Sequence, residues 1–187
     1  MARYVVTAPH DAELAETFDG PLAYLAGPIQ GAGNWHREAV GLLGDLAPDL
    51  HVACPRARNF RGGPEPHLTW ERAYAGRAAR EGVILCWLPR ETAHRCNRSY
   101  GAQPRFELGE WVVRAQRGEI CLVLGIERGF TGGPYLARRL ALDYPQVPLC
   151  RSLRQACAAA AELALGPPDA RLALADLFVP QVGVRVQ

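Results

Sequence analysis

Two long runs of mainly apolar residues do most to constrain how this chain can fold. They read GVILCWLP at residues 82–89 and EICLVLGI at residues 119–126. A strand that is apolar on both sides must be covered on both sides, as in a parallel sheet with helices on each face. Pro89 ends the first run, because proline has no N–H to donate to a sheet. The two runs therefore predict an α/β fold.

Three shorter apolar runs alternate with stretches of helical character. We expect further strands within residues 21–29, 51–55 and 146–150, and helices over residues 35–47, 67–80, 104–117 and 151–165. This alternation predicts a flavodoxin-like, Rossmann-like three-layer sandwich, whose five-stranded parallel sheet has the order 2-1-3-4-5. Residues 1–165 would form this α/β domain, and residues 166–187, which begin with Gly-Pro-Pro, a C-terminal tail.

Composition excludes several classes of function. The formal net charge of +2 is too small to indicate nucleic-acid binding. All 21 basic residues are arginine, so no lysine amine is available for Schiff-base chemistry. No apolar run approaches the ~20 residues of a membrane span, and no signal peptide is recognisable in residues 1–20. We expect a cytoplasmic protein without membrane or nucleic-acid partners.

The six cysteines indicate free thiols in a reducing compartment. They contain no C-x-x-C pair, and several lie inside apolar runs. His94 and Cys96 share a loop and have metal-binding side chains, but no second pair stands at ligand spacing. We therefore predict no metal site.

A glycine-rich turn follows the first predicted strand. GPIQGAG has glycines at 27, 31 and 33, which match neither the dinucleotide fingerprint nor the P-loop pattern. No cofactor is therefore predicted. The turn either exposes backbone N–H groups to a hydroxyl or phosphate, or needs glycine only for its backbone conformation.

Aromatic and basic residues near the same sheet edge also allow two interpretations. Trp35 and Trp70 stand in predicted helices, where they suit core packing or stacking on the base of a ligand. Arg56, Arg58 and Arg61 lie in the loop after the second predicted strand and suit a solvated surface or an anion site.

Three carboxylates, those of Glu107, Glu71 and Glu81, are predicted to surround one edge of the sheet. Acidic residues favour helix starts for electrostatic reasons alone. A parallel sheet, however, presents ligand-binding groups at the carboxyl ends of its strands, and Glu107 opens a helix reached from such an end. Paired carboxylates are the groups that perform glycoside chemistry.

Four segments, taken in order, resemble the nucleoside 2-deoxyribosyltransferase-like family. They are YLAGPIQGAGNWHREAVGLL, CPRARNF, TWERAYAGRAAREGVILCWLP and PRFELGEW, within residues 22–125. The shared pattern is a strand ending in Gly-Pro, an early helical Trp, Pro-Arg, Trp-Glu, an apolar strand ending W-x-P, and E-L-G-E. The order and spacing of the segments carry the resemblance.

The resemblance implies a mechanism for Glu107. The Glu of E-L-G would attack C1′ of a nucleoside and expel the base, with Glu71 assisting base departure and double displacement giving retention. We expect helix N-terminal N–H groups to keep Glu107 ionised. We also expect Phe106, Leu108 and Trp111 to exclude water.

The chain departs from the family pattern at two places. The family usually carries Asp just before the third strand, where this chain offers Glu81. It also places Asp or Ser before the nucleophile to hold the sugar 5′ end, where this chain offers Tyr100 and Gln103. The residues expected to bind substrate are Gly27, Pro28, Ile29, Trp35, Arg56, Trp70, Glu81, Tyr100 and Gln103.

The leading functional hypothesis is an enzyme that cleaves or exchanges the N-glycosidic bond of a nucleoside or nucleotide. The alternative is a non-catalytic nucleotide-binding module. The absence of the family's Asp before the third strand favours this alternative, and the intact FELGE segment argues against it. The resemblance further implies a homo-oligomer, with the apolar tail as a candidate subunit contact.

A second set of basic residues bears on the 5′ end of the substrate. Arg90, Arg95 and Arg98 lie in the loop after the third predicted strand. Together with the arginines of residues 56–61, they either form a cationic pocket mouth that prefers a 5′-phosphate or remain solvated.

Overall fold

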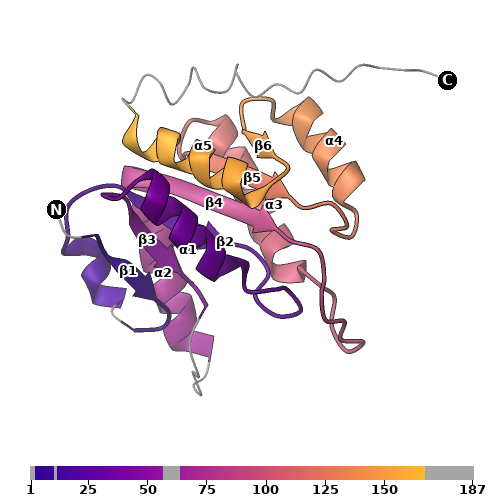
Figure 1. The fold of residues 1–187 in the computed structure, drawn as a ribbon, viewed down its shortest axis with the longest axis horizontal. Helices are drawn as coiled ribbons and strands as arrows, with labels where there is room; N and C mark the ends of the chain where they lie inside the picture. The colour runs from indigo at the N-terminus through magenta and orange to yellow at the C-terminus, as the bar shows by residue number, and fades with distance from the viewer. Residues whose placement is uncertain (1–2, 11, 57–63, 167–187) are drawn as a thin grey trace.

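The structure is a computed structural model that describes residues 3–10, 12–56 and 64–166. It is an α/β fold with a parallel sheet between two layers of helices (Figure 1). The strands are β1 (Val5–Thr7), β2 (Leu22–Ala26), β3 (His51–Cys54), β4 (Gly82–Leu88), β5 (Leu122–Ile126) and β6 (Leu149–Cys150). The helices are the short 3-10 helix η1 (Ala12–Glu16), α1 (Trp35–Leu46), α2 (Pro64–Glu81), α3 (Ala102–Gln116), α4 (Gly133–Asp143) and α5 (Leu153–Leu165).

The sheet has six strands in the order β1-β3-β2-β4-β5-β6, and all neighbouring strands are parallel. Our expectation of five strands is therefore wrong, and the complete strand order differs from the expected one. The additional strand is β1, which pairs with β3 in the register Val5↔Val52 and forms an outer edge. The other five strands lie in the relative order that we expected.

The crossover between β5 and β6 contains α4, which we did not predict. Parallel neighbours need a connection of a dozen or more residues, usually a helix. The helix begins after Gly132, which has φ 73° and so lies in the left-handed region that glycine adopts easily. The tail expected from residue 166 onward lies outside the described residues except for Gly166.

The central strands are buried on both faces, as their apolar sequences predict. Alternate residues of β2 and β4 face opposite layers. One layer contains α1 and α5, which lie side by side, and the other contains η1, α2, α3 and α4 (Figure 1). The three-layer sandwich therefore has one core on each face of the sheet.

The topology places a crevice beyond the carboxyl ends of β2 and β4. The chain leaves β2 through α1 on one face of the sheet, and it leaves β4 through α3 on the other face. The loops that follow these two neighbouring strands therefore diverge, and such a switch point is where open α/β sheets bind ligands.

Candidate active site

A cavity of about 880 Å³ lies at this switch point. Its wall combines the loop after β2, the first half of α2, and the segment that leads into α3. Its lining residues are Tyr24, Ala26, Gly27, Pro28, Ile29, Gln30, Pro55, Pro64, His67, Leu68, Glu71, Arg98, Ser99, Gly101, Ala102, Gln103, Pro104 and Glu107. The structure therefore brings together six residues expected in the site, which are Gly27, Pro28, Ile29, Glu71, Gln103 and Glu107.

Glu107 reaches the cavity from the second turn of α3. The helix begins at Ala102, earlier than the expected start at Pro104. For this reason the carboxylate accepts no hydrogen bond from a helix N-terminal N–H among the described residues. Its Oε1 accepts a hydrogen bond from Gln103 Nε2 at 2.8 Å. Gln103, expected near the sugar 5′ end, thus contacts the carboxylate one helical turn away.

Opposing influences act on the pKa of Glu107. Burial raises this pKa above its ordinary value, and the nearby carboxylates of Glu71 and Glu110 raise it further. The hydrogen bond from Gln103 lowers it, because the amide N–H stabilises the ionised form. Glu107 is therefore a partly desolvated carboxyl group, and its charged form is stabilised by the hydrogen bond from Gln103.

Glu71 faces the same cavity from the middle of α2. We expected this helix to begin at residue 67, with Glu71 near its start, but α2 begins at Pro64. Burial raises the pKa of Glu71. Tyr24 is buried and lines the cavity together with both acids. Burial, followed by the charges of Glu71 and Glu107, raises the pKa of its hydroxyl well above its ordinary value.

His67 is a member of the site that sequence reasoning missed. It lines the cavity one turn before Glu71, and its Nε2 lies 3.5 Å from Glu71 Oε1. Burial lowers the pKa of His67, and a hydrogen bond to the backbone of Pro55 raises it by a smaller amount. The i, i+4 spacing of the two residues within one predicted helix was the available sign of their contact.

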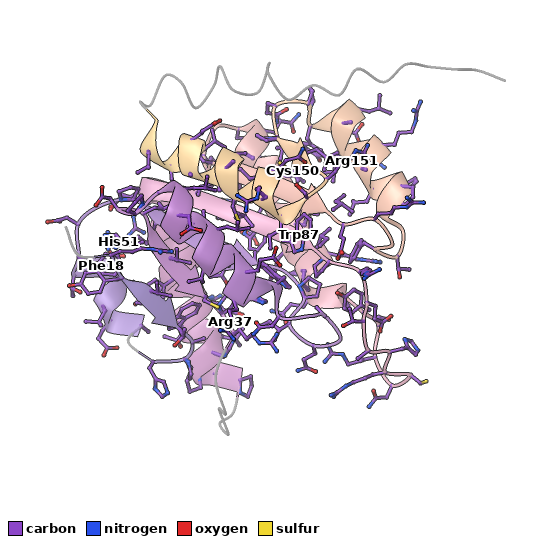
Figure 2. The ribbon with its side chains drawn as sticks, in the orientation of Figure 1. Phe18, Arg37, His51, Trp87, Cys150 and Arg151 are labelled. Carbon is purple, nitrogen blue, oxygen red and sulfur yellow. The ribbon has the colours of Figure 1, made fainter. Side chains whose placement is uncertain are left out.

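The turn after β2 is built for close approach of two strand ends. Gly27 has φ 145°, and a Cβ added there would lie 2.1 Å from the backbone oxygen of Trp87, near the carboxyl end of β4 (Figure 2). Only glycine fits this position. Trp35 holds the same turn, because its Nε1 donates to the Pro28 carbonyl oxygen at 2.8 Å.

Four other residues expected to bind substrate do not line the cavity. Trp35 and Trp70 are buried in the cores on opposite faces of the sheet. Tyr100 supports the loop after β4, since its hydroxyl donates to the Pro89 carbonyl oxygen at 2.8 Å. Arg56 lies behind the turn, with Nη1 3.5 Å from the Ile29 carbonyl oxygen.

Glu81 is also outside the cavity, for a topological reason. It is the last residue of α2 and directly precedes β4, so it lies at the amino end of that strand. The cavity lies at the carboxyl end. The Glu81 carboxylate is instead largely exposed and lies 3.7 Å from Arg77.

The expected arginine cluster contributes one described residue to the cavity wall. Arg98 lines the cavity, and its guanidinium donates to the side-chain oxygen of Gln30. Arg90 instead pairs with Glu127, at 3.7 Å between Nε and Oε1. Arg95 is exposed. Arg58 and Arg61 lie outside the described residues.

The apolar neighbours of Glu107 do not enclose it as expected. Leu108 and Trp111 are buried, but they belong to the core between α3 and the sheet. Phe106 is 81% exposed, so it does not exclude water from the carboxylate within this chain. The reason is helical geometry, since residues one position apart point in different directions.

Residues 3–10, 12–56 and 64–166 contain no group of three or more His, Cys, Asp or Glu side chains that could hold a metal ion. Within the same part of the chain, no helix has both the length and the apolar character needed to cross a membrane.

Fold and cavity define the class of this protein: an α/β protein with two carboxyl groups in one pocket at the switch point of a parallel sheet. No protein-family model matches the chain, and no curated protein matches it significantly. The resemblance to the nucleoside 2-deoxyribosyltransferase-like family stays a prediction.

Proposed function

We propose that this protein cleaves or transfers the N-glycosidic bond of a nucleoside or nucleotide by double displacement. The observation that carries the proposal is the unequal environment of two carboxyl groups in one cavity. Burial raises the pKa of Glu107 as it does that of Glu71, but Glu107 also accepts an amide hydrogen bond that favours its charged form. Burial favours the protonated form of Glu71, and among the described residues no amide opposes this. One carboxylate and one carboxylic acid are what this reaction needs.

In the first step, a Glu107 oxygen forms an ester bond to C1′ while the C1′–N bond breaks. The electron pair of that bond goes to the departing base, and Glu71 delivers a proton to it. In the second step, water or the nitrogen of another base attacks C1′, Glu71 takes the proton of the attacking group, and Glu107 is released. Two displacements at C1′ retain its configuration.

The cavity wall suggests how the substrate lies. Glu107 must face C1′, and Glu71 must face the base. The base would therefore lie along α2, where Leu68, Pro55 and Pro64 offer apolar contacts. The sugar 5′ end would point toward the start of α3, where the guanidinium of Arg98 suits an anion. We propose a nucleoside 5′-monophosphate as the preferred substrate.

The experiment is a panel of nucleosides and 5′-monophosphates, incubated with and without a free acceptor base and separated by chromatography. We expect release of free base, or a new nucleoside where an acceptor is present. Acid-quenched protein should carry the mass of one glycosyl group. Glu107→Gln should fold and bind substrate, yet it should lose the adduct and several orders of magnitude in rate. Turnover within tenfold of wild type would contradict the mechanism.

A non-catalytic nucleotide-binding module is the second candidate. The position of Glu81 favours it, because no carboxylate from the segment just before β4 reaches the cavity. Calorimetric binding of a nucleotide without release of base, under all conditions of the panel, would support this alternative over the enzyme.

We also propose that the protein is a cytoplasmic homo-oligomer. All six cysteines are free thiols, which suits a reducing compartment. Phe106 is largely exposed on α3, and a large exposed apolar side chain suits a contact with a second subunit.

A further inference from the structure

The contact between His67 and Glu71 has no role in the mechanism described so far. Both side chains come from one face of α2 and line the cavity. The imidazole is 25% exposed and the carboxyl 17% exposed, with Nε2 and Oε1 3.5 Å apart. Both side chains are therefore partly exposed, the imidazole slightly more than the carboxyl group.

Burial determines which charge state this pair favours. Burial lowers the pKa of His67 and raises the pKa of Glu71, so both influences favour a neutral imidazole beside a neutral carboxylic acid. The other titratable or charged groups lining the cavity are Tyr24 from β2, Glu107 from α3 and Arg98. A carboxylate at Glu107 also disfavours a second negative charge at Glu71.

We propose that His67 is the positioning residue that holds the protonated carboxyl group of Glu71 in place before the reaction. This inference rests on the proposed function. Glu71 gives its proton to a nitrogen of the departing base and becomes a carboxylate beside the neutral imidazole. In the second step this carboxylate regains a proton from the attacking water or base, which restores the neutral pair. His67 neither gains nor loses a proton in the cycle.

This role predicts that the importance of His67 depends on the leaving group. The base of 2′-deoxyguanosine leaves readily only if it receives a proton. The base of 7-methyl-2′-deoxyguanosine already carries a positive charge, so it departs as a neutral molecule without an acid. A residue that serves the acid should matter for the first substrate and not for the second.

The test compares wild type, His67→Gln, Glu71→Gln and the double variant on both substrates, each with and without a 5′-phosphate. Since general acid catalysis contributes about 10²–10⁴-fold, we expect His67→Gln to lower kcat on the ordinary base by ~10- to 100-fold. Its kcat on the methylated base should stay within ~3-fold, and the double variant should be no slower than Glu71→Gln. Leu68→Ala, from the same wall, should change both rates by the same factor.

A second measurement does not depend on turnover. Nitrogen-detected NMR of the imidazoles, recorded at a pH where His67 is neutral and with His67 assigned by difference from His67→Gln, should show its Nε2 signal moving in Glu71→Gln. The reason is that Nε2 loses the neighbouring carboxyl group. An unchanged signal would show that the two side chains are not in contact, and it would overturn the proposal.

The outcomes separate the two proposals. Equal losses of kcat on both substrates would make His67 a structural residue, and no loss on either would remove it from the reaction. Wild-type protein that releases no base from any member of the panel of nucleosides and 5′-monophosphates would refute the proposed function and the catalytic role of the pair, whereas the NMR result would still report whether the pair exists.

Discussion

His36 should make this protein lose stability as the pH falls. Its side chain is 1% exposed on α1 and stacks on Trp35 with 3.7 Å between ring centroids. Neither ring nitrogen has a hydrogen-bond partner among the described residues. Burial, and to a smaller degree the charge of Arg56, lowers the pKa of His36 from 6.5 to about 3.

The sign follows from proton binding in the two states. Below pH 6.5 the unfolded chain binds a proton at His36 that the folded chain does not bind until about pH 3. The free energy of unfolding therefore falls as the pH is lowered through this window, and His36 contributes no pH dependence above it. Each pH unit within the window costs about 1.4 kcal/mol, so lowering the pH from 7 to 5 costs ~2 kcal/mol. For a chain of this size that equals a decrease in Tm of roughly 4–8 °C.

The assay is urea denaturation of wild type, His36→Leu and His36→Gln at pH 7, 6 and 5. Neither variant can bind a proton at this position, so both should lose ~2 kcal/mol less than wild type between pH 7 and 5. Contributions from other histidines cancel in the comparison. His36→Leu should also be at least as stable as wild type at pH 7, because it removes two buried nitrogens without partners. A pH dependence equal in all three proteins would refute the reasoning.

Three further predictions concern the site. Arg98→Gln should reduce the ratio of kcat/KM for a 5′-monophosphate to kcat/KM for its nucleoside by ~10- to 100-fold, because one charge-assisted hydrogen bond contributes about 1.5–3 kcal/mol. Equal kcat/KM values of the wild-type protein for these two substrates would leave Arg98 as surface charge. Gly27→Ala should destabilise the fold by at least ~1 kcal/mol and disrupt the cavity wall, since its Cβ would meet the Trp87 carbonyl; an unchanged denaturation midpoint would contradict this. Light scattering should show an oligomer that Phe106→Ser weakens, and a fully active wild-type monomer at micromolar concentration would exclude subunit completion of the site.

The sequence by itself determined the parts of the fold that depend on local pattern. Runs such as residues 82–88 are apolar on both faces, and only a covered parallel strand accommodates them. The relative order of five strands follows from short right-handed connections. The same reasoning placed Glu107 and the turn at Gly27 at one sheet edge, and both line the cavity.

Tertiary structure decided the features that depend on a partner distant in sequence or on the rotation of a helix. β1 has three residues and becomes a strand only because β3 offers it an edge. The residues that face the cavity from α2 follow from how that helix rests on the sheet, which directs Glu71 and His67 outward and Trp70 into the core. A one-residue change of position on a helix rotates a side chain by about 100°, so local sequence indicates the helix without settling which face meets the ligand.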